Sequence, residues 1–204
     1  VSEQIDAVFS DIRPDAVKVG MVPSAEIIRA IAGGLDKWHA ENIVVDPVMV
    51  ATSGARLIGE DAVSALIEEL LPRASVITPN IPEAQVLCGC ELSDEESCER
   101  AAVSLARSLG VNVLVKGGHG AHDANDVLAT CSGETHWFRH EAIPTSNTHG
   151  TGCTLSSAIA CGLACGLSVP DAVAAAKEYL TGALSAGLDL GKGSGPLDHM
   201  WQNA

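Results

Sequence analysis

Aromatic residues are scarce in this chain of 204 residues: two Phe, one Tyr and three Trp make up 3% of it. Basic residues are also few, since 12 Lys and Arg face 26 Asp and Glu and leave a net charge of −14. Nucleic acids are bound by basic surfaces and stacked aromatic rings. The composition therefore argues against a nucleic-acid partner. A site for a polyphosphate would have to be built locally, from main-chain N–H groups, a lysine and a metal ion.

Long apolar runs are missing as well. No run reaches the ~18 residues that a membrane span needs, and the first residues, VSEQIDAVFSDI, lack the basic start of a signal peptide. The seven cysteines are an odd number without an export signal or paired CxxC motifs, which predicts a reduced, cytoplasmic setting without a structural zinc site. We expect most of these cysteines to be small core residues. We also expect that the protein has no membrane partner.

The chain also has no initiator Met, and it begins inside an amphipathic pattern of Ile5, Val8, Phe9 and Ile12. We therefore expect further sequence upstream. Hydrophobic residues make up 47% of the chain, enough to bury a sizeable core. A chain of this length predicts a single domain over residues 1–204.

Short apolar runs alternate with helical patterns along the whole chain. Strands are predicted at 16–19, 42–45, 75–77 and 113–115, and a hairpin at 126–131 and 134–140 that turns at Ser132 and Gly133. Helices are predicted near 5–12, 24–38, 63–70, 80–87, 93–109, 151–165 and 170–186, the fifth opened by a Ser93-x-x-Glu96 capping box and stopped by Gly110. We expect Met200 and Trp201 to dock onto the body. The alternation predicts an α/β fold of three layers, α/β/α, around a mostly parallel sheet.

Four unusual loops directly follow four of the predicted strands. They are Gly20-Met21, 46–49 (DPVM), 78–80 (TPN) and 116–119 (KGGH). Ligands of open parallel sheets bind beyond the carboxyl ends of the strands. The four loops should therefore meet at one edge, and this convergence is more specific than any single motif.

Each polar residue in these loops has a structural and a functional interpretation. Asp46 before Pro47 is either an Asx turn that ends a strand or a carboxylate facing a metal or phosphate. Asn80-x-x-Glu83 has the spacing of a capping box, or Glu83 holds Mg²⁺ directly or through water. Lys116 ends an apolar strand, where burial would require an anionic partner, and we favour a phosphate.

Histidines in the loops are less informative. His119 and His149 are candidates for ligands or acid–base groups, but loop residues that hydrogen-bond the backbone are the more common case.

The stretch Thr148–Leu155, THGTGCTL, lies where a loop becomes a helix. Gly150 and Gly152 leave main-chain N–H groups uncovered, and the start of a helix directs such donors and its positive dipole end toward an anion. Cys153 lies in the first turn, where the same field would stabilise a thiolate. A glycine-tolerant turn before a packing helix is an equally good interpretation of this segment taken alone.

Five stretches together resemble the ribokinase-type small-molecule kinases. They are VKVGM at 17–21, VVDPVMVATSG at 44–54, ITPNIPEA at 77–84, VLVKGGH at 113–119 and SNTHGTGCTLSSAIA at 146–160. Within these kinases, the set is most similar to the branch that phosphorylates hydroxymethylpyrimidine and its monophosphate in thiamine biosynthesis. The resemblance implies a ribokinase-like fold, ATP and Mg²⁺ as cofactors, a pyrimidine alcohol as substrate and a homodimer.

The resemblance also implies roles for individual residues. Gly150, Thr151 and Gly152 would surround the transferred phosphoryl group, and Cys153 would stand where most ribokinase-like enzymes carry an aspartate base. Lys116 would contact the ATP phosphates, with Asn80 beside them. Asp46 and Glu83 would belong to the Mg²⁺–phosphate region. The pyrimidine would be contacted by Gly20, Met21, Val48 and Cys153.

Other interpretations remain open at this point. Pyridoxal-type kinases share the fold and the glycine-rich helix start, so pyridoxal or pyridoxine is an alternative substrate. The first strand and the Gly-Gly loop with which such kinases begin do not appear in this sequence, so a catalytically incomplete nucleotide-binding fragment is a second alternative. A thiol-based metal or redox protein is a third.

Overall fold

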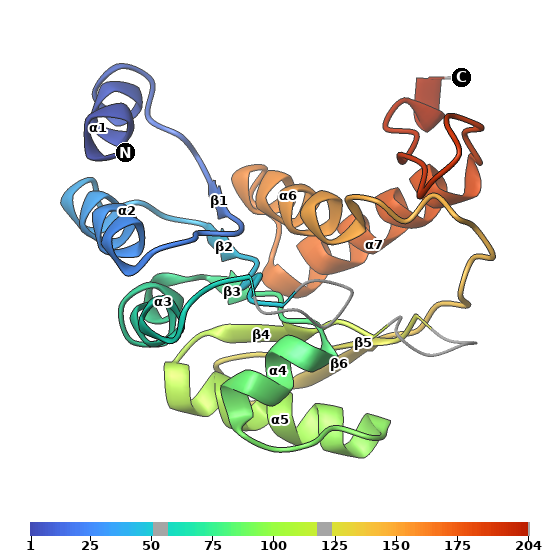
Figure 1. The fold of residues 1–204 in the computed structure, drawn as a ribbon, viewed down its shortest axis with the longest axis horizontal. Coiled ribbons are helices and arrows are strands. Elements are labelled where there is room, and N and C mark those ends of the chain that lie inside the picture. Colours follow the sequence, from blue (N-terminus) through green and yellow to red (C-terminus); the bar gives the residue numbers. More distant parts are fainter. Residues whose placement is uncertain (51–56, 118–123, 204) are drawn as a thin grey trace.

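A six-stranded sheet forms the middle of the structure, a computed structural model that describes residues 1–50, 57–117 and 124–203. Figure 1 shows the sheet between two groups of helices. The strands follow chain order across the sheet: β1 (Val17–Val19), β2 (Ile43–Val45), β3 (Val76–Ile77), β4 (Asn112–Val115), β5 (Asp126–Ala129) and β6 (Thr135–Phe138). β1 to β4 are parallel to one another, whereas β5 and β6 run antiparallel. The expected mostly parallel α/β sheet is confirmed.

Helices cover both faces of this sheet. They are α1 (Ser2–Asp11), α2 (Ala25–Lys37), α3 (Glu60–Ala65), α4 (Ile81–Cys88), α5 (Glu95–Leu109), α6 (Thr151–Ala164) and α7 (Val169–Ser185), with the short turns η1 (Leu66–Leu70), η2 (Leu71–Arg73) and η3 (Trp201–Asn203). In the described ranges, none of these helices combines the length and the apolar character that crossing a membrane requires.

Two hydrophobic cores separate the three layers. Alternate strand residues point to opposite faces of a sheet. Val45 and Ile77 accordingly pack with α2, α3, α4 and α5 in one core. Their neighbours Val44 and Val76, with Leu114, pack with α6 and α7 in the other. The strands are apolar on both sides because both sides are covered, as in other parallel sheets.

The start of α5 corrects one expectation. Ser93 and Glu96 do not form the capping box; Asp94 is the N-cap, and its carboxylate accepts the Ser97 N–H at 2.7 Å. The Ser97 hydroxyl in turn accepts the Asp94 N–H at 3.1 Å. Asp is as good an N-cap as Ser, and the capping box is formed by Asp94 and Ser97, one residue after the expected pair. Gly110 ends the helix with φ of +71°, as expected.

The helix expected over residues 63–70 is not a continuous α-helix. Only α3 is α-helical; η1 is a π-helical segment and η2 a 3₁₀ turn that contains Pro72. Proline has no N–H and cannot give the i→i−4 bond of an α-helix. The backbone therefore leaves α-helical hydrogen bonding as it approaches Pro72.

The hairpin is confirmed at its turn but is shorter than expected. Gly133 has φ of +94°, and its N–H donates to the Thr130 carbonyl at 2.9 Å. At the C-terminal end Trp201 packs on α7, where a Cβ on Gly182 would lie 2.2 Å from the indole ring. Met200 is 64% exposed, so only one of the two residues docks.

The cysteines correct another expectation. All seven lie in the described part of the chain, and Cys98 is the buried one. Cys88 is half-buried, and the five others are exposed: Cys90, Cys131, Cys153, Cys161 and Cys165. Three of these five lie on or at the end of α6, whose buried face is instead formed by residues such as Leu155 and Ile159.

Candidate active site

The loops after the four parallel strands meet at the carboxyl edge of the sheet, as the sequence predicts. Main-chain hydrogen bonds join them directly. The Asp46 N–H donates to the Val19 carbonyl at 2.9 Å, and the Thr78 N–H donates to the Val45 carbonyl at 3.0 Å. The Lys116 N–H donates to the Pro79 carbonyl at 2.8 Å. Each loop is therefore held against the neighbouring strand end.

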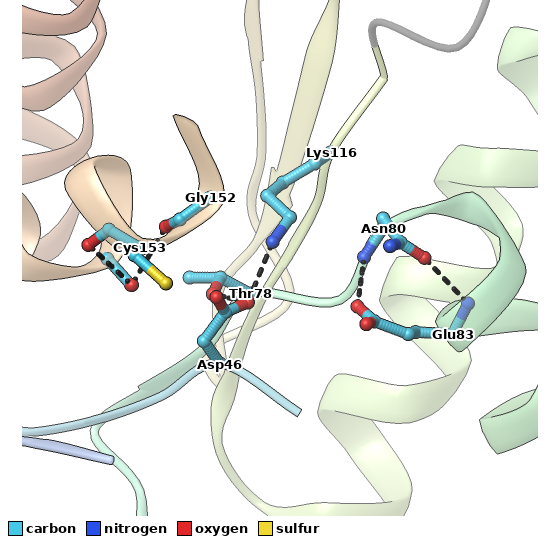
Figure 2. Close-up of polar contacts among 8 residues, drawn as sticks. Asp46, Thr78, Asn80, Glu83, Lys116, Gly152 and Cys153 are labelled. Carbon is cyan, nitrogen blue, oxygen red and sulfur yellow. Dashed lines mark hydrogen bonds and ion pairs between the residues drawn. The ribbon is translucent and has the colours of Figure 1, made fainter. Parts of the chain in front are cut away.

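A buried ion pair occupies the centre of this edge. Lys116 Nζ lies 2.7 Å from Asp46 Oδ1, which also accepts the Thr78 hydroxyl at 3.0 Å (Figure 2). Asp46 is 2% exposed and the Lys116 side chain 14%. A buried lysine requires an anionic partner, and here that partner is the Asp46 carboxylate. Thr78 lies in the predicted loop at 78–80, where no sequence pattern points to this contact with Asp46.

The start of α6 faces the same ion pair. A Cβ added to Gly152 would lie 3.4 Å from Lys116 Nζ and 3.5 Å from Asp46 Oδ2. Gly150 is the N-cap of α6 with φ of +85°, a conformation that favours glycine, and the helix start has no side-chain cap among the described residues. The first N–H groups of a helix lack partners within it and carry the positive end of its dipole. The geometry therefore places anion-binding N–H groups beside a lysine.

Ser156 holds this first turn in place, which the sequence did not reveal. It is fully buried, and its hydroxyl donates to the Gly152 carbonyl at 2.9 Å and lies 3.2 Å from the Cys153 carbonyl. Cys153 itself is exposed. In Figure 2 its side chain points from α6 toward Thr78 and Asp46. A thiol is thus available at the open side of the ion pair.

Asn80 and Glu83 form the predicted capping box at the start of α4. The Asn80 N–H donates to Glu83 Oε2 at 2.9 Å, and the Glu83 N–H donates to Asn80 Oδ1 at 2.8 Å. The structural interpretation is confirmed, but it does not account for the environment of Glu83, which is only 2% exposed. A buried carboxylate needs further polar partners, and the Met49 N–H is one of them.

Burial raises the pKa of Glu83 to about 7. The N–H groups of Asn80 and Met49 and the charge of Lys116 lower this pKa, whereas the charge of Asp46 raises it further. Lys116 and Asp46 are therefore close enough to act on Glu83, and the three charged side chains form one cluster.

The raised pKa predicts a pH dependence of stability. Since the folded pKa lies above the value of 4.5 for a free glutamate, protonated Glu83 favours the folded state, and this contribution is complete below pH 4.5 and is lost as the pH rises through 7. Relative to wild type, Glu83→Gln should therefore gain up to about 3 kcal/mol of unfolding free energy between pH 4.5 and 8. Chemical denaturation at both pH values measures this difference.

The glutamine amide oxygen can still accept the Asn80 N–H, so the cap survives in this variant. Glu91→Gln removes an exposed carboxylate and controls for the loss of one negative charge. A stability difference between Glu83→Gln and wild type that does not change with pH would contradict the prediction.

The remaining expected site residues lie around this cluster. Gly20 and Val48 are half-buried next to Val19 and Asp46, whereas Met21 is 53% exposed. Thr151 is half-buried in the first turn of α6.

Neither histidine adds to the described site. His149 is exposed and pairs through its backbone with Pro196. His119 lies outside the described residues.

Two carboxylates in the cluster offer the hard oxygen ligands that Mg²⁺ prefers. The structure groups no three or more His, Cys, Asp and Glu side chains as a metal site, within the ranges it describes. Proteins usually hold Mg²⁺ with one or two carboxylates, and substrate phosphates supply further ligands. Asp46 and Glu83, both 2% exposed, are carboxylates of the kind that such a site uses.

A second buried ion pair escaped the sequence analysis. Lys177 Nζ on α7 lies 2.9 Å from Asp126 Oδ2 on β5, and the side chains are 7% and 6% exposed. One signal could have revealed it, because Lys177 follows the buried residues Ala172, Val173 and Ala176 on the apolar face of its helix. A lysine at such a position needs an internal anion.

The chain is similar to known kinases over nearly its whole length. The model of the phosphomethylpyrimidine kinase family matches residues 1–198. The thiamine biosynthesis bifunctional protein ThiED of Geobacter sulfurreducens is 51% identical over 201 residues, which cover 98% of this chain and 41% of that protein. The hydroxymethylpyrimidine/phosphomethylpyrimidine kinase of Rhizobium meliloti is 51% identical over 205 residues, covering 98% of this chain and 76% of that protein.

A solved structure also matches closely. The ADP complex of Bacillus subtilis pyridoxal kinase superposes with a TM-score of 0.88 at 35% identity, covering 98% of this chain and 75% of that one. The chain thus spans less than half of the bifunctional relative and about three quarters of the kinases.

Proposed function

This chain belongs to the phosphomethylpyrimidine kinase family, and from that membership and the geometry of the site we propose that it transfers a phosphoryl group from ATP to a hydroxymethylpyrimidine or its monophosphate. The proposal rests on one observation above all: the start of α6 lies within van der Waals reach of the Lys116–Asp46 pair. N–H donors, a cation and carboxylates meet at the place where a phosphoryl group would move. We place this activity in one kinase domain.

Phosphoryl transfer asks a protein mainly for positioning and for stabilisation of negative charge. Lys116 would release Asp46 and donate to the ATP phosphates. The N–H groups at Gly150, Thr151 and Gly152 would hold the oxygens of the moving group. Asn80 keeps Glu83 oriented beside these phosphates through the capping box.

The substrate hydroxyl would lie at the open side of the cluster, against the Cys153 thiol. This thiol would orient the hydroxyl or accept its proton. Gly20, Met21 and Val48 would bound the pyrimidine ring, since their loops adjoin the strand ends at Val19 and Asp46.

Mg²⁺ would be held by Asp46 and Glu83. The ion, when bound, neutralises phosphate charge. Glu83 must lose its proton to serve as a ligand, and Asp46 must leave Lys116 at least in part. The Lys116–Asp46 pair thus keeps both binding groups in place before ATP arrives.

Pyridoxal is the alternative acceptor, because the matching Bacillus subtilis structure is a pyridoxal kinase. We favour the pyrimidine on the higher identity of the Rhizobium meliloti kinase, 51% against 35%. Both are flat aromatic alcohols, so the same cluster could phosphorylate either. The loops around Met21 and Val48 would decide between them.

A direct comparison of acceptors tests this proposal. We expect ATP-dependent phosphorylation of hydroxymethylpyrimidine with a kcat/KM at least about tenfold above that for pyridoxal, equivalent to roughly 1.4 kcal/mol of transition-state binding. Phosphorylated products can be measured by mass spectrometry. A higher kcat/KM for pyridoxal would identify pyridoxal, and not the pyrimidine, as the substrate. Nucleotide binding without transfer to either acceptor would show a catalytically incomplete fragment.

From the resemblance to this family, the proposal also includes that the chain forms a homodimer and is located in the cytoplasm. Analytical ultracentrifugation tests the first, and fractionation of the source cell tests the second.

A further inference from the structure

The buried pair of Asp126 and Lys177 lies close to the active-site cluster but forms no part of it. Asp126 begins β5, and Lys177 lies in the middle of α7. Besides their 2.9 Å ion pair, Lys177 Nζ donates to the Ala124 carbonyl at 2.7 Å. Asp126 Oδ1 accepts the Gly117 N–H at 2.8 Å. Asp126 therefore holds the main chain just after β4, and Lys177 holds the main chain just before β5.

The backbone is closely packed at this point. A Cβ on Gly117 would lie 2.0 Å from the Asn125 carbonyl oxygen, so only glycine fits. The segment after Ala124 is also tied to the end of β6, because the Ala124 N–H donates to the His140 carbonyl at 2.9 Å. Asn125 Oδ1 accepts the His140 N–H at 3.2 Å. Gly117 is thus fixed against a rigid neighbour.

Gly117 shares a peptide bond with Lys116. On its N-terminal side, Lys116 is fixed by the bond from its N–H to the Pro79 carbonyl. On its C-terminal side, the next N–H is the one that Asp126 holds. The direction of the Lys116 side chain therefore depends on Asp126, and the place of Asp126 depends on Lys177.

Burying two charges is expensive, and well-packed apolar side chains often stabilise a fold equally well. A buried pair that supports the peptide after Lys116 is better explained by positioning than by stability. We propose that Asp126 and Lys177 act as a positioning pair, which holds the Gly117 peptide so that Lys116 meets the phosphates of the nucleotide. This role rests on the proposed function, and neither residue contacts the reacting atoms in it.

Amide hydrogen exchange and nucleotide binding together test the pair. In Lys177→Met, we expect the protection of the Gly117 N–H to fall at least about tenfold, whereas the Leu114 N–H in the preceding strand β4 keeps its protection. The Kd for MgATP should rise at least about tenfold, since a small displacement of a binding group is costly. Lys192→Met, at an exposed lysine, is the matched control and should change neither value.

A double-variant cycle separates positioning from direct contact. Asp126→Asn leaves an amide oxygen for the Gly117 N–H but leaves Lys177 without its counter-charge, and it should weaken MgATP as Lys177→Met does. The double variant removes both members of one positioning pair, so its Kd should match that of either single variant to within about threefold. If Lys177 instead contacted the nucleotide independently of Asp126, the two losses in affinity would multiply in the double variant, and the proposal would be overturned.

Exchange at Gly117 is measured without nucleotide or pyrimidine. It therefore tests the pair even if the chain phosphorylates neither acceptor. Unchanged protection of Gly117 in both single variants would also overturn the proposal. If Lys177→Met does not fold, Asp126→Asn and the double variant carry the test, because neither leaves a buried Asp126 carboxylate without its counter-charge.

Discussion

Cys153→Ala is expected to lower kcat by roughly a hundredfold to ten-thousandfold, the range for loss of a positioned acid–base group. The Kd for ATP should stay within about twofold of wild type, because in the proposed arrangement the thiol contacts the acceptor hydroxyl and not the ATP phosphates. Cys153 lies in the first turn of α6, is exposed and points toward Thr78 and Asp46. Alanine is a good helix former and leaves the main-chain N–H groups in place. The loss should therefore appear in the chemical step.

Single-turnover kinetics and equilibrium binding of ATP measure the two quantities separately. Cys161→Ala is the matched control, since Cys161 is exposed on the same helix, two turns away from the site. It should keep wild-type values of both. Wild-type turnover in Cys153→Ala would remove the thiol from the mechanism and leave only the helix N–H groups and Lys116.

Lys116→Ala is expected to weaken ATP binding by at least about a hundredfold, because the phosphates lose their cation and face an unpaired Asp46 carboxylate. Breaking the ion pair should itself cost the fold about 3–5 kcal/mol. Asp46 would then be left 2% exposed without a counter-charge. The variant should also be less stable in the absence of nucleotide. Isothermal titration with an ATP analogue and chemical denaturation measure the two effects.

Lys192→Ala, at an exposed lysine, controls for the loss of one positive charge in a protein of net charge −14. A loss of stability in Lys116→Ala with unchanged nucleotide affinity would show that Lys116 only neutralises Asp46. Together with Cys153→Ala, this variant separates the binding of ATP from the transfer step.

Local sequence signals predicted most of the fold. Strand and helix patterns follow from side chains that alternate or recur every three to four residues, and the strongest boundaries were glycines such as Gly110 and Gly150. The errors came where two local signals competed. Asp94 and Ser93 are both good N-caps one residue apart, and only the contact of Asp94 with Ser97 decides between them. Pro72 altered helical hydrogen bonding upstream in a way that hydrophobic periodicity does not record.

The convergence of loops in the site was predictable for a similar reason. Parallel strands place their carboxyl ends on one edge, so residues after successive strands must meet there. Which atoms pair at that edge was not predictable. Lys116 is 70 residues from Asp46 along the chain, and no local pattern states that its buried partner is a carboxylate rather than a phosphate.

By itself, the sequence determined the order of strands and helices, the sheet edge at which the loops end and the glycine-opened start of α6. These features depend on residues close together in the chain, where backbone conformation and hydrophobic period are decided. Only the tertiary structure decided that Asp46 neutralises Lys116, that Glu83 is buried deeply enough to hold its proton near pH 7, and that Lys177 supports Asp126. Burial and charge pairing arise between distant segments, and they exist only once the layers have packed.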